Sequence, residues 1–124
     1  MTSEPGMRAK RVGEGIREQV ASLLAHEVKD PKAAGAVVTR VEMTADLRTA
    51  RVHVRTLGVT DDAARRRELV GALRRASGLL RREVGRRLGL RYAPELRFTY
   101  DEGVDHTSHI EKLLAEISEE RRSR

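Results

Sequence analysis

Residues 69–88 read LVGALRRASGLLRREVGRRL, and this stretch decides the fold. Apolar residues recur along it with the period of an amphipathic helix, at Leu69, Leu73, Ala76, Leu80, Val84 and Leu88. Gly78 interrupts this stripe, and a glycine in that position weakens or bends a helix. We therefore predict helices over residues 61–76 and 78–90, joined by a structural kink at Ala76-Ser77-Gly78. We also expect the backbone at Gly78 to leave regular helix geometry, so that an added side chain causes strain.

The segments on either side alternate between helical and strand periods. Residues 10–28 have the helical period and end before Asp30-Pro31, because a residue preceding proline avoids the helical region. Residues 35–45 and 50–55 alternate as two half-buried strands, with a short turn between them that predicts a hairpin. Residues 96–100 predict a third strand, and apolar positions between 110 and 117 predict a last helix.

Together these elements predict an α+β fold in which helices cover one face of three strands. In the first strand Val37, Thr39, Val41 and Met43 share one face by strict alternation. The open face of the hairpin displays Arg40, Arg51 and Arg55 beside Glu42. A length of 124 residues predicts one domain, over residues 8–117, with a flexible tail at 1–7 and a frayed tail at 118–124.

Positive charge is concentrated in one segment. Lys and Arg total 25 against 19 Asp and Glu, and 21 of the 25 cations are arginine. Between Arg65 and Arg87 nine arginines face two glutamates, which gives this window +7 when the whole chain carries +6. Such a contiguous excess is typical of a polyanion-binding surface. The alternative is arginine-rich codon usage that leaves these residues on solvated helix faces.

The aromatic residues disfavour base stacking as the main binding mode. They are Tyr92, Phe98 and Tyr100, and the last two share the core face of the third strand. Domains that read bases by stacking need exposed aromatic side chains. A nucleic acid is therefore expected to be bound mainly through its phosphates and shape.

Several other classes of protein are excluded or disfavoured. The chain has no cysteine, and it contains no GxSxG, GxxxxGK[ST] or GxGxxG motif, so we expect neither an enzyme nor a bound cofactor. His106 and His109 beside Asp105 leave open a small metal-dependent nuclease, although no third ligand is evident and we expect no metal. No stretch approaches the length of a membrane span, so a cytoplasmic protein without a membrane partner is expected.

Short segments along nearly the whole chain resemble the ribosome-binding factor A family. They are Val28-Lys29-Asp30-Pro31, Asp46-Leu47-Arg48, Ala76-Ser77-Gly78 and Pro94-Glu95-Leu96, in that order, within residues 8–117. The resemblance implies a type II KH-like α-β-β-α-α-β domain with a mixed three-stranded sheet. It places the interrupted Ala-x-Gly helix where other KH domains carry a GxxG loop. This chain has no GxxG, so clamping of single-stranded bases by that loop is not carried over.

The same resemblance implies a monomeric, non-enzymatic ribosome assembly factor. Its expected partners are the small ribosomal subunit and its rRNA, with ribosomal proteins as further neighbours. Its expected role is late subunit maturation and processing of the rRNA 5′ end, important in the cold. A general nucleic-acid-binding protein of the nucleoid type is the alternative.

The rRNA-binding residues are expected around the kink, because helix ends flanked by guanidinium groups suit a phosphate backbone. The candidates are Arg67, Arg74, Arg75, Ser77, Gly78, Arg81, Arg82 and Arg86.

Overall fold

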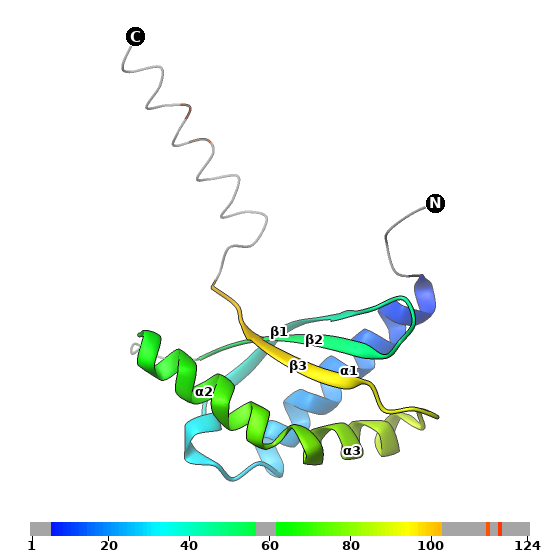
Figure 1. Ribbon diagram of the computed structural model, residues 1–124, viewed down its shortest axis with the longest axis horizontal. Coiled ribbons are helices and arrows are strands. Elements are labelled where there is room, and N and C mark those ends of the chain that lie inside the picture. The colour runs from blue at the N-terminus through cyan, green and yellow to red at the C-terminus, as the bar shows by residue number, and fades with distance from the viewer. Residues whose placement is uncertain (1–5, 57–61, 103–113, 115–116, 118–124) are drawn as a thin grey trace.

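The computed structural model describes residues 6–56 and 62–102, together with Leu114 and Ile117. Its elements appear in the order helix, strand, strand, helix, helix, strand, with a short 3-10 turn after the first helix (Figure 1). Their bounds are α1 Met7–His26, η1 Pro31–Ala33, β1 Ala36–Met43, β2 Thr49–Thr56, α2 Ala63–Arg75, α3 Ser77–Leu88 and β3 Glu95–Tyr100. This order confirms the predicted α-β-β-α-α-β sequence of elements.

The three strands form one mixed sheet in the order β1-β2-β3. β1 and β2 pair antiparallel as the predicted hairpin, whereas β2 and β3 pair parallel, with Val52 opposite Phe98. Parallel neighbours need a long crossover between them. The α2–α3 pair provides that crossover, so the helices that carry the basic segment are held against the sheet at both ends.

The strict alternation predicted for β1 is wrong at Thr39. The register of the β1–β2 pair shifts between Val38 and Arg40. Thr39 forms a β-bulge there, so no residue of β2 is paired with it in the ladder. Val38 and Met43 are five residues apart, so strict alternation would place them on opposite faces of the sheet. The extra residue at the bulge places both on the buried face. The Thr39 hydroxyl lies 2.6 Å from an Asp101 carboxylate oxygen, just beyond the end of β3.

The helices bury one apolar face of the sheet, and no helix among the described elements covers the other face, which we call the open face (Figure 1). From α1 the core receives Ile16, Val20 and Leu23, each fully buried. From α2 and α3 it receives Leu69, Leu73, Leu80 and Val84, the stripe that the sequence pattern predicts. The open face displays the exposed residues predicted for it, Arg40, Glu42, Arg51 and Arg55.

The break between α2 and α3 lies at Ala76, whose φ of −86° and ψ of −2° end the first helix and start the second. The Ser77 hydroxyl donates to the Arg74 carbonyl at 2.7 Å across this break. Gly78 lies inside α3 without a positive φ, and a Cβ added there meets open space. The strain expected at Gly78 is therefore wrong, because the chain changes direction two residues earlier.

The helices begin and end a few residues away from the positions predicted from the sequence, because local backbone contacts and conformations determine their ends. Met7, assigned to the flexible tail, begins α1, and α1 ends at His26, where the Glu27 and Val28 amides both donate to the Leu23 carbonyl. α3 ends at Leu88 because Gly89 adopts a left-handed φ of 62°. The predicted C-terminal helix and the tail at 118–124 lie outside the described residues, apart from the exposed Leu114 and Ile117.

Two glycines of α3 give opposite predictions for stability. A Cβ on Gly85 would lie 3.0 Å from the Ala93 Cβ, so Gly85→Val should destabilise by about 1–3 kcal/mol through overpacking. Gly78→Ala should stabilise by up to about 1 kcal/mol, because alanine favours a helix and the site is open. Denaturant unfolding of both variants measures the difference, and a destabilised Gly78→Ala would contradict the regular helix at this residue.

Candidate nucleic-acid interface

All six arginines predicted for the interface are exposed, but they divide into two groups. Three are held by neighbours: Arg75 by Asp30, Arg81 by the Ala93 carbonyl and Arg86 by Glu83. The other three, Arg67, Arg74 and Arg82, make no hydrogen bond or ion pair with any residue that the structure describes. These three are the free arginines of the α2–α3 surface.

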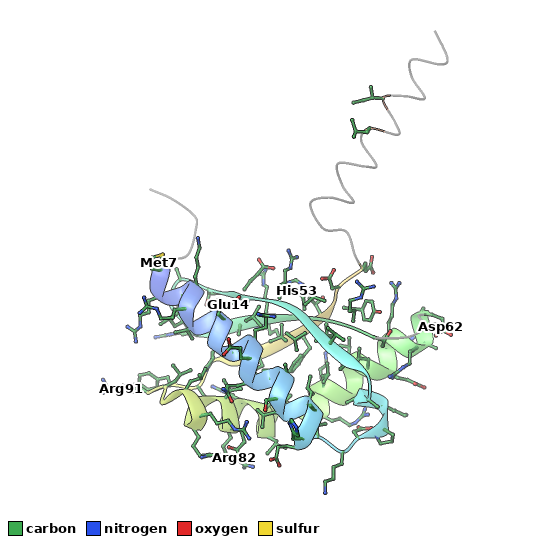
Figure 2. All side chains as sticks on the ribbon, turned by 180° about the vertical axis from the view of Figure 1, so that it is seen from behind. Met7, Glu14, His53, Asp62, Arg82 and Arg91 are labelled. Atoms are coloured by element: carbon green, nitrogen blue, oxygen red, sulfur yellow. The ribbon has the colours of Figure 1, made fainter. Side chains whose placement is uncertain are left out.

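The free arginines project away from the sheet. Arg67 and Arg74 are seven residues apart on α2 and therefore share one face of that helix. Arg82 on α3 lies four residues after the exposed Gly78. Figure 2 shows Arg82 on the opposite side of the molecule from His53, which belongs to the open side of the sheet. A polyanion at the helix surface would thus meet guanidinium groups that make no ion pair within the described residues, although Glu83 lies beside Arg82 and interacts with its charge.

The first turn of α3 adds a further feature that favours anions. Its N-cap residue, Ala76, offers no side-chain hydrogen bond, and the first turn contains no acidic residue. The positive end of the helix dipole is therefore not neutralised by a side chain of that turn. Ser77 and Gly78 lie at this end, so the predicted kink residues are placed where a phosphate is electrostatically favoured.

The held arginine Arg75 shows why exposure alone does not define the interface. Its Nη2 donates to an Asp30 carboxylate oxygen at 3.1 Å and ties α2 to the segment before η1. The pKa of Asp30 lies below its ordinary value, first because the Lys32 amide donates to the carboxylate and second because Arg75 does. Arg75 is thus already paired with a carboxylate of the same protein, the side chain of Asp30.

A groove of about 1170 Å³ opens beside the kink, and its position was not predicted from the sequence. It lies between the start of α1, the β1–β2 turn, the start of α3 and the α3–β3 loop. Ser77, Gly78 and Arg81 from the predicted interface line it. Arg8, Arg48 and Arg91 line it as well, together with the carboxylates of Asp46 and Glu95.

The β1–β2 turn brings Arg48 to this groove. Leu47 adopts a positive φ of 62°, which is uncommon for a residue with a side chain. The Asp46 carboxylate accepts hydrogen bonds from the Thr44 hydroxyl at 2.6 Å and from the Arg48 amide at 3.1 Å. These two bonds lower the pKa of Asp46 and hold the turn. The sequence signal for Arg48 was its place in the Asp46-Leu47-Arg48 segment.

Tyr92 is the one aromatic residue to which no role was assigned from the sequence pattern. Phe98 is 5% exposed and Tyr100 is partly buried, so the prediction that these two face the core is confirmed. Tyr92 is 75% exposed and lines the groove, with the Arg91 guanidinium 5.5 Å from its ring centre. The available signal was its position in the loop between two elements, where no strand alternation directs it inward.

Other candidate sites receive no support from the described residues. Across residues 6–56 and 62–102 no three His, Asp or Glu side chains come together to hold a metal ion. Asp105, His106 and His109 lie outside the described residues. Among the described helices, none combines the length and apolar character needed to cross a lipid bilayer. On the open side of the sheet, Glu42 contacts both Arg40 at 3.6 Å and His53 at 2.6 Å.

The Asp30–Arg75 contact gives a prediction on pH. Because folding lowers the pKa of Asp30, its contribution to stability is present above about pH 3.8 and is lost as the pH falls through the folded value. Arg75→Gln should raise the pKa of Asp30 without returning it to 3.8, since the Lys32 amide still donates. Carbon-13 NMR titration of the carboxyl measures both values. An unchanged pKa in Arg75→Gln would show that the contact is absent in solution.

Comparison with known proteins places the chain in a family. A family model for ribosome-binding factor A matches residues 8–114. Ribosome-binding factor A of Sorangium cellulosum is 52% identical over 112 residues, which cover 90% of each chain. The solution structure of a Thermotoga maritima protein described as a ribosome-binding factor A is 31% identical, with a TM-score of 0.57 over 80% of this chain and 88% of that one.

A third relative shares the fold at lower identity. It is a homology model of Thermus thermophilus ribosome-binding factor A, fitted into a cryo-EM map of a complex with the 30S subunit. It superposes with a TM-score of 0.55 and 21% identity, over 80% of this chain and 97% of that one. The two structural comparisons show that these relatives share the fold described above. The chain belongs to the ribosome-binding factor A family.

Proposed function

We propose that this protein binds the small ribosomal subunit through its rRNA and assists late maturation of that subunit. The observation that carries the proposal is the group of free arginines, Arg67, Arg74 and Arg82, on the outer side of the interrupted helix. Unpaired guanidinium groups bind phosphates through charge-assisted hydrogen bonds without first breaking a contact inside the protein. Family membership supports the ribosome as the source of those phosphates, since a relative has been fitted into a complex with the 30S subunit.

The finer parts of the proposal follow from the family. They are a role in processing the 5′ end of the rRNA, importance in the cold, and action as a cytoplasmic monomer without catalysis. Ribosomal proteins are proposed as additional neighbours at the binding site. A general nucleic-acid-binding protein would use the same arginines, so the experiments below compare the ribosomal subunit with duplex DNA.

Loss of the free arginines should weaken binding and its dependence on salt. We expect the variant Arg67→Gln/Arg74→Gln/Arg82→Gln to keep its fold, because all three side chains are exposed and unpaired. Each lost phosphate contact reduces the slope of log affinity against log salt by roughly 0.7–0.9, so three should flatten it by about 2. Binding to purified small subunits at several salt concentrations measures the slope, with circular dichroism as the check on folding.

A matched control removes the same charge from the other side of the molecule. Arg40→Gln/Arg51→Gln/Arg55→Gln changes three exposed arginines on the open face of the sheet. We expect wild-type affinity and slope for this variant. If the control loses affinity and the helix variant does not, the open face of the sheet is the rRNA surface. Equal affinity of the wild type for duplex DNA and for the small subunit would favour the nucleoid-type alternative.

The maturation role gives a prediction in cells. In a bacterium that lacks its own ribosome-binding factor A, the wild-type chain should restore growth in the cold and reduce rRNA precursors extended at the 5′ end. The free-arginine variant should do neither, although it accumulates to the same level. Primer extension on the rRNA measures the precursor, and the sheet-face variant is the control. Full rescue by the free-arginine variant would contradict the proposed interface.

A further inference from the structure

The exposure of Tyr92 is not accounted for by packing. Its ring is 75% exposed, although the chain has only three aromatic residues and the other two pack toward the core. The Arg91 guanidinium lies 5.5 Å from the ring centre and leaves most of the ring surface open to solvent. An open ring beside a guanidinium is an arrangement on which a further planar group can stack.

The loop that carries Tyr92 is firmly held from two sides. Arg81 donates from Nε and Nη2 to the Ala93 carbonyl at 3.1 and 3.0 Å. The Glu95 amide donates to the Arg48 carbonyl at 2.8 Å, which joins the loop to the β1–β2 turn. Pro94 between them is fully buried. The ring is therefore presented from a fixed backbone, which reduces the entropy lost when a ligand stacks on it.

The surroundings of the ring fit a nucleic acid strand. Four arginines line the groove, Arg8, Arg48, Arg81 and Arg91, and their charge exceeds that of Asp46 and Glu95. Carboxylates in such a setting accept hydrogen bonds from ribose hydroxyls or base amino groups. The volume of about 1170 Å³ exceeds the roughly 300–1000 Å³ typical of small-molecule pockets, so a segment of a chain fits better than a free nucleotide.

We propose that the groove binds a single-stranded segment of RNA, with one unpaired base stacked on Tyr92. The flanking phosphates contact Arg48 of the β1–β2 turn and Arg91 of the α3–β3 loop, which both line the groove. A base in a duplex is already stacked on its neighbours, so its face is not available to the ring. This proposal rests on the proposed rRNA binding and adds to it a second kind of contact, which depends on a base and not on charge alone.

Tyr92→Trp tests the contact directly because the chain has no other tryptophan. The substituted ring keeps the ability to stack, and its fluorescence can be excited selectively. Titration with a short single-stranded RNA should quench this fluorescence, and the same RNA annealed to its complement should not. The full-length chain is used throughout. Equal quenching by both RNAs, or by neither, would overturn the proposal.

Affinity measurements separate stacking from charge. Tyr92→Ala should weaken binding of the single-stranded RNA by roughly 5- to 100-fold, as expected for loss of one base–aromatic stack, with no change in the salt slope. Tyr92→Phe should bind like the wild type, because the ring is retained. Arg48→Gln should instead flatten the salt slope by roughly 0.7, since it removes a phosphate contact. Wild-type affinity of Tyr92→Ala would overturn the proposal.

These experiments distinguish failure of the stacking site from failure of the proposed rRNA binding. If Tyr92→Ala binds normally but the free-arginine variant loses affinity for the small subunit, the stacking site is wrong and the interface on α2 and α3 remains. If the wild-type chain binds neither the small subunit nor single-stranded RNA, the proposed function itself is wrong. Competition by an acidic peptide that displaces the quenched RNA equally well would show that the groove selects charge and not bases, which also overturns the stacking proposal.

Discussion

The fold depends on burial of one apolar face of the sheet by all three helices, with α1 packed mainly on β1 and with α2 and α3 packed mainly on β3. Leu69, Leu73, Leu80 and Val84 are each fully buried, although they come from two helices. A single helix commonly connects two parallel strands, but here the buried stripe is divided between two helices that meet at Ala76. The break at Ala76 lets α2 and α3 each pack against the sheet, and it exposes the opposite side of both helices to solvent. The packing of the two helices on the sheet therefore also produces the surface that we propose for RNA binding.

The same break determines how positive charge is distributed. Because the stripe faces the sheet, arginines between the apolar positions must point outward, and three of them have no partner among the described residues. The break also places the start of α3 beside the β1–β2 turn and the α3–β3 loop, where a basic groove forms. We propose that the outer side of α2 and α3 binds phosphates and that the groove binds an unpaired base.

Periodicity predicted the elements because burial of one face of each helix and strand dominates this fold. It failed at the bulge of Thr39, which changes the phase of β1, and in the strain expected at Gly78, which lies in regular helix after the break at Ala76. It could not place Arg48 and Tyr92 in one groove, because their proximity depends on the parallel pairing of β2 and β3, which brings together a turn and a loop 44 residues apart at one end of the sheet. It also could not tell free arginines from held ones, since Arg75 and Arg81 find their partners far along the chain.

Side-chain footprinting shows directly which face of the protein the small ribosomal subunit covers. Hydroxyl-radical modification of the full-length chain, free and bound to the small ribosomal subunit, reports which side chains the ribosome covers. We expect Arg74, Arg82 and Tyr92 to be protected, and Arg51 and Arg55 on the open face of the sheet to be modified as in the free protein. Protection of Arg51 and Arg55, with the α2 and α3 side chains still modified, would contradict the proposed binding surface.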